Sequence, residues 1–215
     1  MQLKKTAMFL SLVLSCVALT SAMAQTAAPQ AAPTTLTAAE REEALKQLET
    51  TRDNFLKSIA GLSQKQWTFK PAPDRWSVAE VAEHITVSES TIFGLVEKVM
   101  QSPASPEKRE QVKGKDQVIE QRMPDRSHKA QAPEMLRPTG RFATEAELVK
   151  TFEERRKATI DYVRTTNDDL RDHFFDHPVF GTLDGYQWVL LLSGHSARHT
   201  EQIEEVKADP NFPKE

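Results

Sequence analysis

The sequence has few cysteines, glycines and aromatic residues, and no excess of positive charge. Its 215 residues include one cysteine and seven glycines, aromatic side chains make up 7%, and 31 acidic residues outnumber 28 basic ones. Few glycines and aromatics disfavour a β-barrel with many tight turns. A formal net charge of −3 leaves no basic surplus to neutralise phosphates, so we expect no nucleic-acid partner.

The N-terminal segment 1–24 has the three parts of a secretory signal. Lys4 and Lys5 precede an apolar stretch, and the small residues Ser-Ala-Met-Ala end the segment just before Gln25. The apolar stretch is too short to span a bilayer comfortably. We therefore expect a cleaved signal and a periplasmic or secreted protein, with no membrane span after cleavage. An uncleaved membrane anchor is the alternative.

Cys16, the single cysteine, lies inside this signal segment. A lipoprotein signal would use it as the lipid acceptor, although the residues before it match a lipobox poorly. The cleaved chain has no disulfide and no thiolate, so any metal must be held by His, Asp or Glu. Residues 25–36, rich in Ala, Pro, Thr and Gln, are predicted to form a flexible tether.

Four amphipathic segments follow the tether. Each begins with a typical helix-capping residue, namely Thr37, Ser77, Thr144 and Asp184. Apolar residues recur at spacings of three and four, which predicts helices, and no convincing alternating run predicts a strand. We therefore expect an all-α four-helix bundle over residues 37–209, followed by a short tail, 210–215.

The connection between the second and third predicted helices, residues 102–143, is unusually long. It is rich in Pro, Lys, Arg and Gln. A connection of this length can run along the whole bundle, whereas a short loop would force the two helices it joins to be antiparallel. The length of the connection thus permits a parallel arrangement of these two helices.

Three histidines are candidates for a metal site. His195 and His199 are four residues apart in the fourth predicted helix, so both rings lie on one face and can offer nitrogens to one ion. His84 lies about two turns into the second helix. If these helices are antiparallel neighbours, His84 falls at the same height. A hydrogen-bonded core histidine is the alternative for His84.

A second histidine pair, His173 and His177, has the same spacing but a different context. Pro178 follows it, and residues 171–184 are predicted to be a loop, where a spacing of four has no helical meaning. The pair is a candidate for additional ligands only if this loop folds over the site.

Two motifs resemble those of the DinB-like (DinB/YfiT) superfamily. PAPDRWSVAEVAEHI, at 71–85, resembles the sequence with which these proteins enter their second helix. GTLDGYQW at 181–188, followed by GHSARHTEQI at 194–203, resembles their fourth-helix signature. The resemblance covers about residues 40–208.

The resemblance implies both a fold and a ligand set. It implies a four-helix bundle with up-down-down-up topology, which agrees with the long second connection. It also implies a divalent metal ion bound by one histidine of the second helix and a His-x-x-x-His of the fourth. Carried onto this sequence, these ligands are His84, His195 and His199. Three imidazoles suit zinc, nickel or iron without distinguishing among them.

What the resemblance implies about activity is less specific. Members include thiol-dependent transferases and proteins described as metal-dependent hydrolases, so we expect either activity on a small-molecule substrate. The alternative is a non-catalytic secreted bundle with a structural ion, which would be expected to have a fourth protein ligand. Glu80, Ser88 and Gln202 lie one turn from a candidate ligand and could orient it, although a helix cap already explains Glu80. Pairing of two bundles into a homodimer is compatible with the resemblance.

Overall fold

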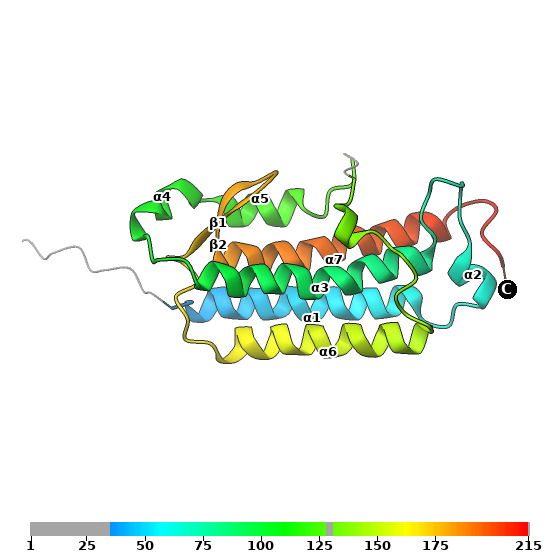
Figure 1. Cartoon of the computed structure of the whole chain (residues 1–215), viewed down its shortest axis with the longest axis horizontal. Coiled ribbons are helices and arrows are strands. Elements are labelled where there is room, and N and C mark those ends of the chain that lie inside the picture. The colour runs from blue at the N-terminus through cyan, green and yellow to red at the C-terminus, as the bar shows by residue number, and fades with distance from the viewer. Residues whose placement is uncertain (1–34, 128–130, 215) are drawn as a thin grey trace, which may run out of the picture. The chain divides into compact units, whose positions relative to one another are not determined.

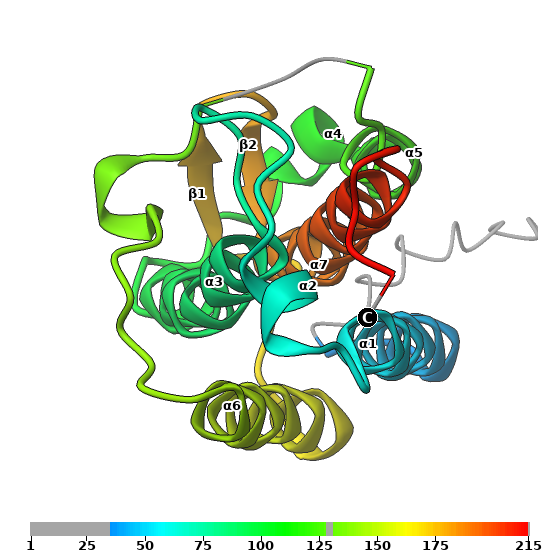
Figure 2. The ribbon, with the colours of Figure 1, turned by 90° about the vertical axis from the view of Figure 1, so that its right-hand side faces the viewer.

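Four long helices form the bundle in the computed structural model, which describes residues 35–127 and 131–214. The predicted signal, 1–24, and the tether up to residue 34 lie outside the described residues. The long helices are α1 (Ala38–Ile59), α3 (Val78–Met100), α6 (Glu145–Thr165) and α7 (Gly185–Lys207). In the end-on view they occupy the four corners of the bundle (Figure 2).

The chain passes through these helices in up-down-down-up order. α1 and α7 run one way and α3 and α6 run the other (Figure 1). α3 packs against α7 and α6, and α1 packs against the same two helices. The predicted topology is therefore confirmed. Consequently α3 and α7 are antiparallel neighbours, the condition under which His84 was expected to meet the fourth helix.

The helix starts follow from their capping residues. In α1, α3 and α7 the cap side chain accepts a backbone N–H, and the residue at the third helical position reaches back to the N–H of the cap residue. These paired bonds satisfy backbone donors that the first helical turn leaves free. Glu80 acts in this way for α3 and also pairs with Lys70, so its predicted capping role is confirmed.

Shorter elements lie between the long helices. α2 (Gln64–Thr68) joins α1 to α3, and the connection from α3 to α6 contains η1 (Pro106–Lys108), α4 (Arg109–Val112), α5 (Lys115–Arg122) and η2 (Glu134–Leu136). α5 packs along the outer side of α7 (Figure 2). The chain just after α5 lies close to α7, because a Cβ placed on Gly194 would lie 3.0 Å from side-chain atoms of Met123.

Residues 171–184 contain a β-hairpin, so their prediction as a loop was wrong. β1 (Phe174–His177) pairs antiparallel with β2 (Gly181–Asp184). The Nδ1 atom of His177 accepts N–H groups from Val179 and Phe180 and so holds the turn. Strands of four residues offer too few alternations for the pattern to be recognised in the sequence.

A buried ion pair joins α6 to α3 and is hydrogen-bonded to α7. The guanidinium of Arg156, on α6, is fully buried and donates to Glu89 on α3. Ser196, on α7, donates to Glu89 (2.9 Å) and accepts from Arg156 (2.7 Å). Because Ser196 directly follows His195, this contact also helps to set the direction of the site histidines.

The packed part of the chain extends past both predicted domain limits. Leu36, the last residue of the predicted tether, is only 7% exposed in the core. Phe212, in the predicted tail, packs edge-on against Phe69 with ring centroids 5.5 Å apart. The sequence pattern did not indicate these two contacts, because single apolar anchors lie outside the periodic helical pattern.

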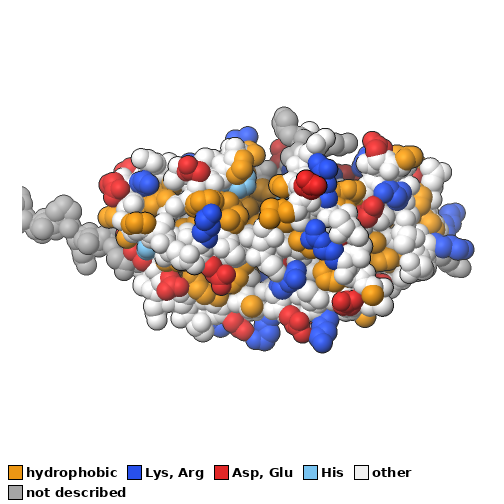
Figure 3. Space-filling view, in the orientation of Figure 1, with side chains coloured by type: hydrophobic (Ala, Val, Ile, Leu, Met, Phe, Trp, Pro, Cys, Tyr) orange, Lys and Arg blue, Asp and Glu red, His pale blue; other side chains and the backbone are white. Residues whose placement is uncertain are grey.

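The surface carries a few large apolar side chains. Figure 3 shows apolar groups gathered over the β1–β2 hairpin and the adjoining end of α3, and Val179 in the hairpin turn is 71% exposed. Over residues 35–127 and 131–214, none of the helices combines the length and apolar character that crossing a membrane requires.

Candidate metal centre

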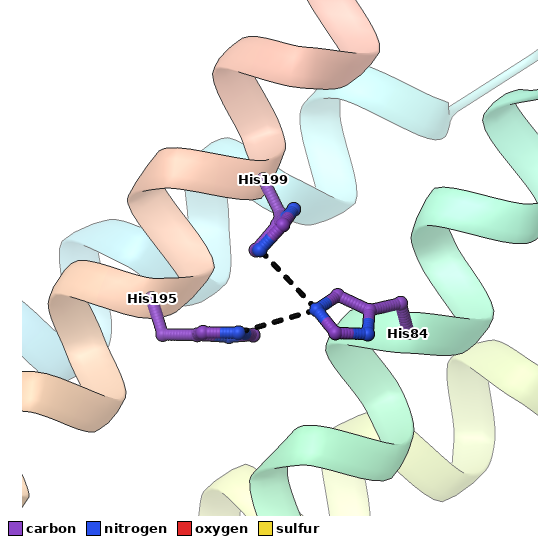
Figure 4. A group of neighbouring side chains, drawn as sticks. All are labelled: His84, His195 and His199. Atoms are coloured by element: carbon purple, nitrogen blue, oxygen red, sulfur yellow. Dashed lines mark hydrogen bonds between the residues drawn. The ribbon is translucent and has the colours of Figure 1, made fainter. Parts of the chain in front are cut away.

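Three histidine rings meet between α3 and α7. The Nε2 atom of His84 lies 3.2 Å from the Nε2 atoms of both His195 and His199. Figure 4 shows His84 on α3 facing the two rings, which come from successive turns of α7. One nitrogen of each ring lies within 4.8 Å of the others. The structure thus brings together the three residues selected from the sequence; their role as metal ligands stays a prediction.

Hydrogen bonds at the opposite ring nitrogens fix two of the tautomers. His84 Nδ1 donates to the carbonyl of Leu136 at 2.8 Å, and His199 Nδ1 donates to the side-chain oxygen of Gln202 at 2.8 Å. In a neutral imidazole the proton at Nδ1 leaves Nε2 with a lone pair. The lone pairs of His84 and His199 therefore face each other.

Two facing lone pairs at 3.2 Å repel unless a proton or a cation lies between them. Protonation is disfavoured. Burial lowers the pKa of His84, and burial together with the other two rings lowers the pKa of His195 well below its ordinary value. Burial and the neighbouring His84 lower the pKa of His199 to about 3. A metal cation is the remaining group that can relieve the repulsion.

The spacing and the donor set fit a small divalent ion. Nitrogens bound about 2.0–2.1 Å from a tetrahedral ion lie about 3.3 Å apart, close to the 3.2 Å separations observed here. Neutral imidazole is a common ligand for zinc, nickel and iron. The donor set and these two separations therefore fit the implied ion.

Within residues 35–127 and 131–214, no fourth His, Cys, Asp or Glu joins the three rings. His173 and His177, the candidates for additional ligands, lie elsewhere. His173 Nδ1 donates to the carbonyl of Ser102, and the His177 ring contacts Trp188 with centroids 5.4 Å apart. Neither histidine approaches the site.

The long connection from α3 to α6 supplies the group that orients His84 and a second group that supports Gln202, the α7 residue on His199. Leu136, in η2, provides the carbonyl on His84. Arg126 donates to the same Gln202 oxygen that His199 uses (3.3 Å) and forms a bidentate pair with Glu205. Such hydrogen bonds to the second ring nitrogen fix ring orientation and raise ligand basicity.

The three residues proposed from the sequence as orienting groups have different outcomes. Gln202 contacts His199 directly. Glu80 serves the helix cap instead. Ser88 is 1% exposed, and its Oγ has no hydrogen-bond partner among the described residues. The Leu136 carbonyl and Arg126 were not foreseen, because a backbone oxygen leaves no signal in side-chain spacing and Arg126 lies in a segment without periodicity.

The lowered pKa values make the stability of the metal-free protein pH-dependent. In the unfolded chain these imidazoles titrate near pH 6.5, whereas in the folded protein burial lowers the pKa of all three, and that of His199 to about 3. Their stabilising contribution is complete above about pH 6.5 and is lost as the pH falls towards the folded pKa values. Between about pH 6 and 5 the free energy of unfolding falls as the pH is lowered. We predict that His199→Gln makes this fall smaller by about 1.4 kcal/mol per pH unit, the contribution of one proton.

Denaturant unfolding of metal-free wild type and His199→Gln at closely spaced pH values measures this difference. His173→Gln is the control, because the His173 ring lies outside the three-histidine cluster. It should leave the cluster's contribution to the slope of unfolding free energy against pH unchanged. Equal slopes for wild type and His199→Gln would show that the site histidines titrate alike in the folded and unfolded chains.

Comparisons with known proteins place the chain in one superfamily. The model of the DinB superfamily matches residues 47–203, a range that includes all three site histidines. The uncharacterized protein YuaE of Bacillus subtilis (strain 168) is 25% identical over 150 residues, covering 69% of this chain and 88% of YuaE. YfiT from Bacillus subtilis, described as a probable metal-dependent hydrolase with an unusual four-helix bundle topology, superposes with a TM-score of 0.56 at 13% identity, covering 87% of this chain and 95% of YfiT. The chain belongs to the DinB superfamily.

Proposed function

We propose that the protein is a metal-dependent hydrolase in which His84, His195 and His199 hold one divalent ion. The observation that carries the proposal is the convergence of three uncharged ring nitrogens with spacings suited to a shared ion. Three neutral ligands leave the ion its full 2+ charge, which can lower the pKa of a bound water and polarise a substrate carbonyl.

The chain's own residues would hold and shape this site. The Leu136 carbonyl and the Gln202 amide keep the rings of His84 and His199 in the tautomer that presents Nε2 to the ion. Trp76, partly buried, has its ring centroid 5.1 Å from that of His84 and provides an apolar wall beside the ligands. Such a wall favours binding of the apolar part of a small-molecule substrate and limits access of bulk water.

Hydrolysis fits the chain better than either alternative considered. A structural ion would be expected to have a fourth protein ligand, and no fourth His, Cys, Asp or Glu of the described residues joins the three rings. Thiol transfer needs a second reactant, because the chain's only cysteine is Cys16. Hydrolysis needs only water, and the description of YfiT as a probable metal-dependent hydrolase supports the same reaction class.

We also propose that the protein acts outside the cytoplasm after cleavage between Ala24 and Gln25. The support is the order of basic, apolar and small residues in segment 1–24. Expression of the full chain in a secreting bacterium, followed by N-terminal sequencing of the exported fraction, should give a chain that starts at Gln25. An intact N-terminus on a protein that stays in the cytoplasm would contradict export.

The hydrolase proposal predicts joint loss of metal and activity when one ligand is removed. Metal-free protein reloaded with zinc, nickel or iron should bind one ion per chain and cleave members of a panel of small esters, amides and lactones without added thiol. His195→Ala should bind the metal at least about tenfold more weakly and lose hydrolysis, because two imidazoles cannot replace three. Metal content and substrate turnover are the measurements.

His173→Ala is the matched control, since it removes an imidazole that lies away from the cluster. It should keep both metal and turnover. A His195→Ala variant with full metal content would contradict the assigned ligands. Turnover that appears only with an added low-molecular-weight thiol would show that the reaction is thiol transfer and not hydrolysis. A fully loaded protein whose ion has no exchangeable coordination position would show that the ion is structural.

A further inference from the structure

Glu83 is a buried carboxylate beside the histidine site that the proposed chemistry does not use. It precedes His84 on α3 and is 5% exposed. Its two carboxylate oxygens accept the backbone N–H groups of Thr139 (2.8 Å) and Gly140 (2.9 Å). Both oxygens are engaged in this way, so a role other than that of a metal ligand is needed to explain Glu83.

The segment that Glu83 contacts is folded back on itself. Gly140 has a φ of 75°, a region that favours glycine, and this turn directs two successive N–H groups at one carboxylate. The guanidinium of Arg141 donates to the carbonyl of Met135 at 2.9 Å and lies 3.8 Å from Glu83. Residues 134–141 therefore form an internally linked unit.

This unit contacts α3 through two consecutive residues of that helix. Glu83 binds its C-terminal part at Thr139 and Gly140, and His84 binds its N-terminal part through the carbonyl of Leu136. The partners of Glu83 are three and four residues after Leu136. The position of the Leu136 carbonyl thus depends on whether Glu83 holds the turn at Thr139 and Gly140.

We infer that Glu83 is a positioning residue of the histidine site, which anchors segment 134–141 to α3 and so keeps the Leu136 carbonyl on His84 Nδ1. The consequence for metal binding rests on the proposed function. Without this carbonyl the His84 ring loses the bond that fixes both its orientation and its Nδ1–H tautomer, and the other tautomer has no lone pair at Nε2. By thermodynamic reciprocity, a metal on His84 strengthens the attachment of the segment.

Glu83→Gln tests this role, because the amide keeps the shape of the side chain but sets an NH₂ group against one of the two N–H donors. We expect zinc affinity to fall about tenfold, as for other groups that orient a ligand. Amide hydrogen exchange at Thr139 and Gly140 should become faster. In the metal-free protein, ¹⁵N NMR of the imidazoles should show that His84 no longer keeps a single Nδ1–H tautomer.

Glu147→Gln is the matched control. Glu147 also accepts a backbone N–H near the end of this connection, from Ala143 at 2.9 Å, but it is exposed and belongs to the start of α6. This variant should leave zinc affinity and the His84 tautomer unchanged. An equal loss of affinity in both variants would mean that any weakening of the connection has this effect, which contradicts a specific role for Glu83.

A second variant keeps the test independent of the fold of the bundle. Gly140→Ala strains the turn at a φ of 75°, yet the added Cβ meets no atom within 4 Å. It should weaken zinc binding in the same direction as Glu83→Gln while α3 and α7 keep their exchange protection. Wild-type affinity and tautomer in both variants would overturn the inference. If the wild-type chain binds none of zinc, nickel and iron, the proposed function fails, and the tautomer measurement alone decides the role of Glu83.

Discussion

Three uncharged imidazole nitrogens are held against one another between two antiparallel helices, and the rest of the site is organised around that contact. Nδ1–H bonds to Leu136 and Gln202 direct the lone pairs of His84 and His199 inward. Burial lowers the pKa of both rings, so protonation is disfavoured as a way to relieve the repulsion between the two lone pairs. The folding energy of the surrounding bundle holds the rings in an arrangement that a cation would make favourable.

The topology of the bundle explains how this arrangement arises. Because α3 and α6 run in parallel, the chain must return along the bundle between them, and part of that return lies over α3 and α7 (Figure 1). The same connection then supplies Leu136 to His84 and Arg126 to the Gln202 amide. One long crossover thus both permits the helix order and provides the groups that orient the ligands. A short loop could do neither.

The sequence predicts the helices and the pairing of His195 with His199 well because both depend on local spacing, whereas His84 was added through the antiparallel placement of its helix and the family resemblance. Capping residues such as Ser77 and Asp184 mark helix starts, and the pair His195 and His199 has meaning as soon as its helix is recognised. Features that depend on distant partners were missed. Arg156 lies among charged residues and would be taken for a surface residue, yet it is buried against Glu89, 67 positions away. The hairpin was missed because its strands are only four residues long.

We propose that His84, His195 and His199 bind one ion together. X-ray absorption spectroscopy of the zinc-loaded protein tests it most directly, because multiple scattering from imidazole rings counts the histidine ligands. We expect three imidazoles at about 2.0–2.1 Å and at least one further light-atom ligand that is not histidine. A best fit with one imidazole or none, and carboxylate oxygens in place of the others, would contradict it.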